Sequence, residues 1–216
     1  MVLQKAVFDM DGLIFDSERM FMRSLGEAMA EEGYTLTPEI YVNTLGLDSR
    51  LVTEYMKSVY GSDYPVYEMG QKAREKMSEA AKSGLPVKKG IINLLEYLKN
   101  NNIECVVASS SETRFVRMYL EGAGLSDYFT ELIGGETVTM SKPNPEIFLK
   151  ALGDTKKENA VVFEDSENGV KAAINAGIAV ICIPDMKKPS DEVLKNSFAC
   201  VSDADEAIEI LFKNLR

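Results

Sequence analysis

The chain has 216 residues, 45% of them hydrophobic and 27% charged, so it can bury a sizeable core as one domain with an insert or as two small domains. Its net charge of −10, with no basic run, argues against a surface that neutralises nucleic-acid phosphates. It contains no histidine, which excludes every mechanism that needs a histidine base, nucleophile or metal ligand.

The first predicted element is a strand over residues 3–8, and two carboxylates, Asp9 and Asp11, stand one residue apart at its end. Side chains at positions i and i+2 of an extended chain point the same way, so both acids can share one small site. Gly12 then allows the backbone to turn sharply beside a ligand. Taken alone, so short a stretch more often marks a turn whose acids cap backbone amides.

A block of helical patterns comes next, and no strand is predicted over residues 16–84. In the first helix, over residues 17–33, apolar residues recur with the spacing of one helix face, and a glycine closes the pattern. Further helices are predicted after Pro38, over about residues 50–60 and over about residues 66–81. This stretch therefore predicts an all-helical domain.

Strands and helices alternate after residue 84, which predicts a parallel α/β sheet flanked by helices. The predicted core domain comprises residues 1–15 and 85–216, with the all-helical domain of residues 16–84 inserted into it. Further strands are expected at residues 103–108, 131–133, 160–163 and 179–183. Helices are expected at residues 91–100, from residues 109–111 to Gly122 or Gly124, after an Asn144 N-cap with Pro145 as first helical residue, at residues 166–176 and from Asp203.

Polar side chains stand at the carboxyl ends of several predicted strands or on the loops nearby. In parallel α/β sheets, ligands bind beyond these ends, where the strand order reverses, so the polar residues are expected to converge on one rim. Taken singly, Ser109, Glu164 and Asp165 also fit helix caps, and Lys142 fits a solvated surface charge. Capping does not demand their order along the chain, so together they favour a site. The residues are Asp9, Asp11, Ser109, Lys142, Glu164 and Asp165.

Four stretches, in order, resemble the four motifs of the haloacid dehalogenase superfamily. They are residues 9–18 (DMDGLIFDSE), 108–109 (AS), 141–148 (SKPNPEIF) and 162–169 (VFEDSENG). The helical stretch after the first motif resembles the cap of the β-phosphoglucomutase-like phosphatases of that superfamily. The resemblance covers the whole chain and implies a Rossmann-like parallel sheet with an inserted helical cap domain.

The resemblance also implies catalytic roles. Asp9 would attack the phosphorus of a phosphate monoester and form an aspartyl-phosphate. Asp11 would protonate the leaving alcohol and later take a proton from the attacking water. Ser109, the following residue Ser110 and Lys142 would hold the phosphoryl oxygens. Dehalogenases of the superfamily lack the second aspartate, so the presence of Asp11 argues for phosphoryl transfer.

The metal ligands that the resemblance implies are the Asp9 side chain, the Asp11 backbone carbonyl, Asp165 and, directly or through water, Glu164. Acids this close together repel one another and resist ionisation unless a cation neutralises them. Oxygen ligands without histidine or cysteine favour Mg²⁺. The predicted cofactor is therefore Mg²⁺.

The cap is expected to close over the rim, exclude water and select the leaving group. Arg50 is its first candidate for substrate binding, because a guanidinium suits a second anion or sugar hydroxyls. A solvated charge is the more common role of an arginine in such a position.

These observations predict a Mg²⁺-dependent phosphatase of small phosphorylated metabolites, above all sugar phosphates, and the substrate class rests on the cap resemblance alone. A β-phosphoglucomutase-like hexose-phosphate mutase is an alternative, although the mutase relative uses a cap histidine and this chain has none. A non-catalytic module that holds phosphate or Mg²⁺ as a signal is a second alternative, against which the intact Asp11 argues. The expected partner is a phosphorylated metabolite, with no nucleic acid and no membrane, and the protein is expected to be a monomer or weak dimer.

The cysteines are odd in number, and Cys105 and Cys182 lie in apolar strand-like runs, which indicates buried reduced thiols. The start of the chain lacks the pattern of a signal peptide, and no apolar run is long enough to span a membrane. The expected location is cytoplasmic.

Overall fold

The computed structural model describes residues 2–81 and 84–214. The chain divides into two compact units, Met1–Asp16 with Pro86–Arg216 and Ser17–Leu85, which we call the core unit and the helical unit. Compared with the predicted domain limits, Asp16 belongs to the core unit and Leu85 to the helical unit.

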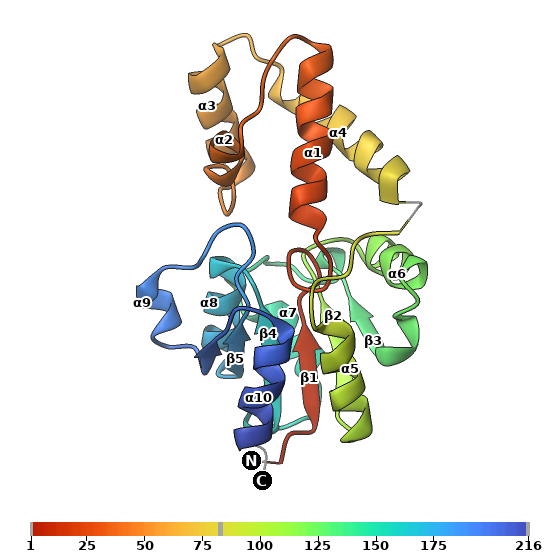
Figure 1. The fold of residues 1–216 in the computed structure, drawn as a ribbon. Coiled ribbons are helices and arrows are strands. Elements are labelled where there is room, and N and C mark those ends of the chain that lie inside the picture. Colours follow the sequence, from red (N-terminus) through yellow and green to blue (C-terminus); the bar gives the residue numbers. More distant parts are fainter. Residues whose placement is uncertain (1, 82–83, 215–216) are drawn as a thin grey trace. The chain divides into compact units, whose positions relative to one another are not determined.

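Among the described residues, the core unit forms a six-stranded sheet in which all neighbouring strands are parallel (Figure 1). The strand order is β3-β2-β1-β4-β5-β6. The central strands are fully apolar or nearly so because both faces of the sheet are covered. The predicted parallel sheet flanked by helices is thus confirmed. The strands are β1 (Lys5–Phe8), β2 (Glu104–Ala108), β3 (Glu131–Ile133), β4 (Ala160–Glu164), β5 (Ala179–Cys182) and β6 (Ala199–Cys200).

Helices cover both faces of this sheet, with α5 and α10 in front and α7 and α8 behind in Figure 1. Each buries the apolar stripe that its sequence spacing provides, as in α5, where the buried leucines and isoleucine recur every three or four residues. The helices of the core unit are α5 (Ile91–Asn100), α6 (Thr113–Gly122), α7 (Glu146–Leu152), α8 (Glu167–Ala176), α9 (Asp191–Leu194) and α10 (Ala204–Asn214), with short 3-10 helices at Ser126–Tyr128, Gly135–Thr137 and Lys157–Asn159.

The hydrophobic core on one face of the sheet begins with a row of valines. Val106, Val7, Val162 and Val180 are register partners across four neighbouring strands and are all buried. They belong to the same buried cluster as side chains of α7 and α8, including Phe148. This packing holds the central strands together and so fixes the positions of the residues at their ends.

The helical unit consists, among its described residues, of α1 (Ser17–Glu31), α2 (Pro38–Val42), α3 (Ser49–Tyr60) and α4 (Val66–Ala81). The predicted all-helical pattern of this stretch agrees with these elements. Thr37 and Asp48 cap α2 and α3 by accepting backbone N–H bonds three residues later. α1 and α4 pack side by side, and Lys72 on α4 pairs with Glu32 just after α1 at 2.5 Å.

The structure corrects details of the predicted elements. α6 begins at Thr113, not within residues 109–111. Asn144 is not the N-cap of α7, because the helix starts at Glu146 and Pro145 occupies the cap position. Asn144 Oδ1 accepts a hydrogen bond from the Glu146 N–H at 3.0 Å. β6 and α9 were not expected, because elements of two and four residues are too short to show a periodic pattern.

The strand order reverses at β1, which has β2 on one side and β4 on the other. The chain builds β2 and β3 on the first side and then crosses to build β4, β5 and β6 on the second. In sheets of this kind the ligand crevice lies beyond the carboxyl ends of the two strands at the reversal. Asp9 directly follows β1, and β4 ends with Glu164, so both acids stand at that crevice.

Two segments connect the core unit to the helical unit, and within the core unit they run side by side. The Asp16 N–H donates to the Pro86 carbonyl and the Lys88 N–H to the Ile14 carbonyl, both at 2.9 Å. Phe15 and Val87 form an antiparallel bridge between these bonds. The outgoing and returning chains are therefore tied together next to the loop that follows β1.

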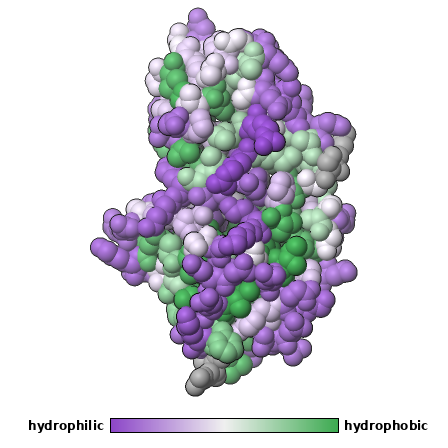
Figure 2. Space-filling model, in the orientation of Figure 1, coloured by the Kyte–Doolittle hydropathy of each residue, from purple (hydrophilic) through white to green (hydrophobic). Residues whose placement is uncertain are grey.

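Hydrophilic side chains dominate the faces of both units that Figure 2 shows, with apolar side chains scattered between them. This distribution matches the acidic, highly charged composition. Of the helices in the described part of the chain, none has both the length and the apolar character needed to cross a bilayer.

Candidate functional site

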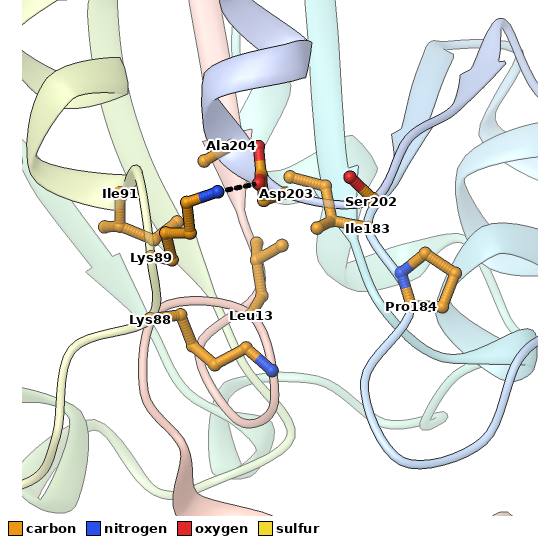
Figure 3. Close-up of a pocket in the computed structure, with 9 residues that line it drawn as sticks. All are labelled: Leu13, Lys88, Lys89, Ile91, Ile183, Pro184, Ser202, Asp203 and Ala204. Carbon is orange, nitrogen blue, oxygen red and sulfur yellow. Dashed lines mark hydrogen bonds and ion pairs between the residues drawn. The ribbon is translucent and has the colours of Figure 1, made fainter.

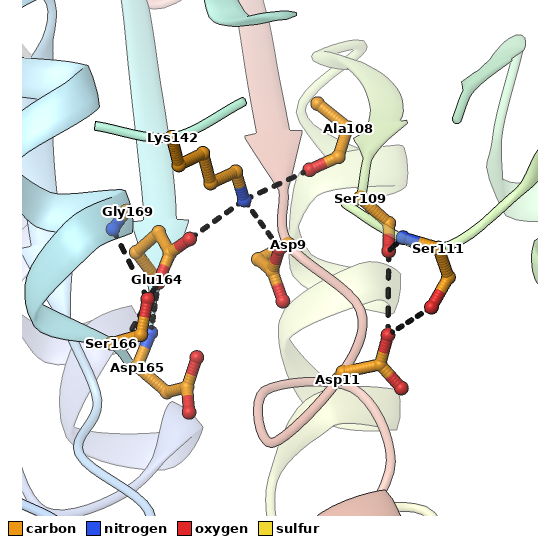
Figure 4. Close-up of polar contacts among 10 residues, drawn as sticks. All are labelled: Asp9, Asp11, Ala108, Ser109, Ser111, Lys142, Glu164, Asp165, Ser166 and Gly169. Atoms are coloured by element: carbon orange, nitrogen blue, oxygen red, sulfur yellow. Dashed lines mark hydrogen bonds and ion pairs between the residues drawn. The ribbon is translucent and has the colours of Figure 1, made fainter. Parts of the chain in front are cut away.

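Asp9 is buried at the point where the strand order reverses (Figure 4). Its N–H donates to the Phe163 carbonyl at 3.0 Å, which extends the ladder between β1 and β4 by one residue. Glu164 and Asp165 follow Phe163 directly, so this backbone bond holds Asp9 beside two further acids. The paired strands thus bring together residues that are more than 150 positions apart.

Lys142 is buried in this site and is not a solvated surface charge, since its side chain is 6% exposed. Its Nζ donates to Asp9 Oδ1 at 2.5 Å, to Glu164 Oε1 at 2.7 Å and to the Ala108 carbonyl at 3.2 Å. It also lies 4.7 Å from the centre of the Phe148 ring. These contacts engage all three hydrogens of the ammonium group, so Lys142 orients Asp9 and supplies one positive charge.

Asp11 points toward the loop that follows β2 (Figure 4). Its Oδ2 accepts the Ser111 hydroxyl at 2.7 Å and the Ser109 hydroxyl at 3.4 Å. Ser109 is fully buried, and its Oγ accepts the Ser111 N–H at 3.0 Å. The serine hydroxyls therefore hold Asp11 and the loop, and they do not cap α6. The sequence does not single out Ser111, because a run of three serines gives no signal for which hydroxyl reaches Asp11.

The loop after β2 is supported by the segment that follows β3. The Gly135 N–H donates to the Ser111 carbonyl at 3.0 Å. The Glu136 carboxylate accepts the Thr113 N–H at 3.1 Å and so caps α6 from a different part of the chain. A negative charge at this helix start is favourable, because the first N–H groups of a helix lack partners.

Glu164 is completely buried and uses both of its carboxylate oxygens. Oε1 accepts from Lys142, and Oε2 accepts the Asp165 N–H at 2.8 Å, the Ser166 N–H at 2.8 Å and the Ser166 hydroxyl at 3.0 Å. Ser166 Oγ in turn accepts the Gly169 N–H at 3.1 Å and caps α8. Glu164 therefore links Lys142 to the turn that carries Asp165.

Two motif glycines are required by the close approach of carboxylates. A Cβ at Gly169 would lie 1.6 Å from Glu164 Oε1. A Cβ at Gly12 would lie 2.3 Å from Asp165 Oδ2, and Gly12 also has a φ of +80°, which residues with side chains rarely adopt. Both glycines allow backbone to pack directly against the acids of the site.

The acids outnumber the cations at this site. Asp9, Glu164 and Asp165 each offer an oxygen, and these oxygens lie within 4.8 Å of one another. Lys142 pairs with the first two, so when all three carboxylates are ionised two negative charges remain uncompensated. An arrangement of this kind is stable only if the acids stay protonated or a further cation binds.

Burial and the closeness of the carboxylates shift the pKa values of two acids and of the lysine at this site. Burial raises the pKa of Asp9 to about 7, and the charges of Glu164 and Asp11 add to the rise while Lys142 opposes it. Burial also raises the pKa of Asp165 well above its ordinary value, with further contributions from Glu164, Asp9 and Asp185. Burial would lower the pKa of Lys142, but the adjacent Asp9 and Glu164 carboxylates outweigh it and raise that pKa.

Comparison with known proteins identifies the family that shares this arrangement of residues. Residues 6–183 match the haloacid dehalogenase-like hydrolases. The chain belongs to this family. The resemblance of its four motifs is thus confirmed, and the motifs correspond to the acids, serines and lysine that the fold brings together.

Relatives of this haloacid dehalogenase-like hydrolase span nearly the whole chain. A Thermotoga maritima protein named "Phosphorylated carbohydrates phosphatase" is 27% identical over 178 residues, which are 82% of each chain. A Drosophila melanogaster protein named "Probable pseudouridine-5'-phosphatase" is 30% identical over 207 residues, covering 92% of this chain and 89% of that one. A solved Thermotoga maritima structure, provisionally named a beta-phosphoglucomutase, has 25% identity and a TM-score of 0.82 and covers 99% of this chain and 100% of that chain.

The carboxylate oxygens at the site of this haloacid dehalogenase-like hydrolase fit a hard divalent cation as ligands. In the described part of the chain, no hydrogen-bond donor contacts Asp9 Oδ2 or either carboxylate oxygen of Asp165. These free oxygens, together with two uncompensated negative charges, suit an ion such as Mg²⁺. Glu164, in contrast, has both oxygens engaged by protein groups, so its place in the metal shell stays a prediction.

The core unit brings six of the predicted site residues together: Asp9, Asp11, Ser109, Lys142, Glu164 and Asp165. Ser110 is exposed on the same loop as Ser109. Arg50 lies on α3 of the helical unit, where its side chain is 72% exposed and pairs with Glu54 at 3.0 Å. The substrate-binding roles of Ser110 and Arg50 stay predictions.

Proposed function

We propose that the chain is a Mg²⁺-dependent phosphatase that hydrolyses small phosphorylated metabolites, above all sugar phosphates, through an aspartyl-phosphate on Asp9. It is a phosphoric monoester hydrolase by its family and by the relatives named as phosphatases. The metal, the covalent route and the sugar substrate are the parts that we add. The observation that carries them is a buried aspartate with one oxygen held by Lys142 and the other free, beside uncompensated acids.

Asp9 Oδ2 is the proposed nucleophile. Because Lys142 holds Oδ1 at 2.5 Å, the carboxylate has one fixed orientation and one oxygen available for attack. Attack forms a bond between Oδ2 and phosphorus and breaks the bond between phosphorus and the ester oxygen. A carboxylate held in line with the phosphate in this way can supply about 7–11 kcal/mol of the barrier reduction.

Asp11 is the proposed general acid and base. Its protonated carboxyl group gives a proton to the ester oxygen as the alcohol leaves. The ionised carboxylate then takes a proton from water, whose oxygen attacks the phosphorus, releases inorganic phosphate and restores Asp9. The Ser109 and Ser111 hydroxyls hold Oδ2 during these steps, so the other oxygen is available for the proton.

Charge at the phosphoryl group is balanced from two sides. The free oxygens of Asp165, together with the Asp9 carboxylate oxygen that does not attack, would hold Mg²⁺, which when bound would neutralise the clustered carboxylates and the phosphoryl oxygens. Lys142 stands at the same crevice, and its positive charge would stabilise the negative charge that develops during transfer. Glu164 supports both by fixing Lys142 and the turn at Asp165.

The substrate class rests on the relatives and on the helical unit. The relative that acts on phosphorylated carbohydrates supports sugar phosphates. We propose that the helical unit serves as a cap that selects the leaving group, with the paired segments at Phe15 and Val87 as its attachment. The described cysteines are free thiols, which supports a cytoplasmic location.

The test is release of inorganic phosphate from a panel of sugar phosphates, nucleotides and an aryl phosphate, with Mg²⁺ and with EDTA. Asp9→Asn is expected to lower release by at least about 10⁴-fold, because the nucleophile is lost. Asp154→Asn is the matched control, since Asp154 is exposed outside the site, and it should keep wild-type release.

Release that persists with EDTA would remove the metal from the mechanism, and release that survives in Asp9→Asn would remove the covalent route. Full turnover in Asp11→Asn would contradict its acid–base role. Isomerised hexose phosphate in place of inorganic phosphate would indicate a mutase, an outcome that the structural neighbour provisionally named a beta-phosphoglucomutase makes worth including.

A further inference from the structure

An ion pair lies next to the proposed site but outside its motifs. Lys88 Nζ donates to Asp185 Oδ1, and the two side chains are 20% and 2% exposed. Lys88 is on the segment by which the chain returns from the helical unit, and Asp185 is on the loop that follows β5. Surface ion pairs are common and contribute little, whereas a carboxylate buried to this extent needs its partner.

Lys88 contacts the loop after β1 through its backbone as well. Its N–H donates to the Ile14 carbonyl at 2.9 Å. In Figure 3, the Lys88 side chain runs along the loop that carries Leu13, toward the segment that follows Pro184. The lysine therefore holds this loop at Ile14 while its ammonium group reaches past the loop to Asp185.

Asp185 and Asp165 both lie beside Gly12, next to the position that a Cβ would occupy. A Cβ at Gly12 would lie 2.3 Å from Asp165 Oδ2 and 3.5 Å from Asp185 Cβ. The Asp165 carboxylate, which is proposed to hold the metal, and Asp185, which pairs with Lys88, therefore both pack close to the Gly12 turn. A shift of Gly12 would remove the surface against which the Asp165 carboxylate rests.

We propose that Lys88 and Asp185 are positioning residues of the metal site, which hold the Gly12 turn against Asp165 and so fix the direction of the Asp165 carboxylate. This inference rests on the proposed function. The pair acts through Gly12 and Asp165, and it has no part in bond formation or proton transfer.

The chain offers a matched control in the next residue. Lys88 and Lys89 both line a pocket of about 170 Å³, which Figure 3 shows. Lys89 pairs with Asp203 at 2.6 Å, but its side chain is 76% exposed. Lys89→Met removes a neighbouring ion pair of the same type without removing the contact to Asp185.

The first measurement is Mg²⁺ binding by titration calorimetry, on wild type, Lys88→Met, Lys88→Arg and Lys89→Met freed of metal. We expect Lys88→Met to weaken binding by about 10–100-fold, as is typical when a residue that orients a ligand is lost. Lys88→Arg keeps the charge and should restore affinity, and Lys89→Met should bind as wild type does. The KM for substrate at saturating Mg²⁺ should stay unchanged in Lys88→Met. Wild-type affinity in a folded Lys88→Met would overturn the proposal.

The second measurement is amide hydrogen exchange of residues 10–15 in the metal-free proteins, which does not depend on activity. Exchange should be about tenfold faster in Lys88→Met than in Lys89→Met, because Asp185 loses its ion-pair partner and no longer holds the Gly12 turn, while the backbone bond to Ile14 is kept in both variants. Unchanged exchange would overturn the proposal even where Mg²⁺ binding is lost. If wild type binds no Mg²⁺ and releases no phosphate, the proposed function fails, and exchange still decides whether the pair holds the loop.

Discussion

Charged side chains are used in opposite ways in the core unit and the helical unit. In the core unit, the Lys142 side chain is 6% exposed and pairs with Asp9, 8% exposed, and Glu164, 1% exposed. In the helical unit, the Arg50 side chain is 72% exposed and pairs with Glu54, 58% exposed. Withdrawing a charge from water costs far more than a surface pair contributes, so buried charges concentrated in one place indicate residues kept for chemistry.

The interior of the helical unit shows what a buried region without such a site contains. Tyr64 is buried against Tyr34 and Tyr60, with ring centres 4.9 Å and 4.8 Å away. Offset and edge-to-face aromatic pairs of this kind stabilise a fold. The comparison therefore separates a unit in which most of the buried charged groups form the proposed site from one whose described residues include no buried charged side chain.

Among the substitutions that test this comparison, Lys142→Met is expected to have the largest effect. Without its ammonium group Asp9 loses its fixed orientation and the phosphoryl group loses a positive charge, so phosphate release should fall by about 10²–10³-fold. Lys150→Met is the control, because Lys150 is exposed on α7 and its ammonium group bonds to the Thr137 carbonyl at 3.0 Å, not to an acid of the site. Steady-state kinetics would measure both variants. Equal activity of the two would mean that the buried Lys142 does not contribute to catalysis.

Gly169→Ala should have the next largest effect, on folding. The added methyl group would overlap Glu164 Oε1, so the free energy of unfolding should fall by about 1–3 kcal/mol. Gly122→Ala is the matched helical control, because a Cβ at Gly122 would meet nothing within 4 Å, and alanine there should cost nothing or add up to about 1 kcal/mol. Urea unfolding measures both. Stabilisation by both alanines would show that Glu164 does not pack against the glycine.

Tyr64→Phe should have a small effect at neutral pH. Among the described residues nothing bonds to the buried Tyr64 hydroxyl, so its removal should leave the free energy of unfolding unchanged or raise it by about 1 kcal/mol. Burial raises the pKa of Tyr64 to about 12, with Tyr60 and Tyr34 adding to the rise, against about 10 in an unfolded chain. Tyr64 therefore ionises first in the unfolded state, and the free energy of unfolding of the wild type should fall as the pH rises from about 10 to about 12.

The phenylalanine variant should lose less stability over that pH range, which thermal unfolding at several pH values would measure. Tyr67→Phe is the control, because Tyr67 is 76% exposed on α4 and should follow wild type. The same alkaline loss in wild type and Tyr64→Phe would contradict the burial argument.

The smallest change in stability is expected from Arg50→Ala. An exposed pair with this spacing contributes about 0.3–0.5 kcal/mol, so unfolding should hardly change. If Arg50 binds substrate, KM should rise more than kcat falls. Glu54→Ala removes the same ion pair and keeps the arginine, so its KM should not rise. An unchanged KM in Arg50→Ala would remove Arg50 from the site.

Much of the fold could be predicted because its signals are local. The apolar runs before Asp9 and Glu164 and the amphipathic stretches between them follow from side-chain periodicity alone. The alternation of strands and helices then leaves few possible topologies. β6 and α9 are too short for such a signal, and the start of α6 depends on Glu136, which lies outside the helix.

The site was predictable where a motif carries its own chemistry and not where contacts cross the fold. Asp9, Asp11 and Asp165 stand just beyond strand ends, and Lys142 lies in its motif on the loop before α7. Ser111 is chemically identical to its two neighbours, and only the path of the loop after β2 brings its hydroxyl to Asp11. The pairing of Lys88 with Asp185, 97 positions apart, has no trace in local sequence.

The sequence by itself determined the element types, the order of the acids, serine and lysine along the chain, and the exclusion of histidine chemistry, because these depend on residue identity and short-range spacing. Only the tertiary structure decided that Lys142 is buried with all its hydrogens engaged and that Glu164 binds protein groups with both oxygens. Burial and hydrogen-bond partners depend on which distant segments meet, and strand pairing between β1 and β4 sets that here.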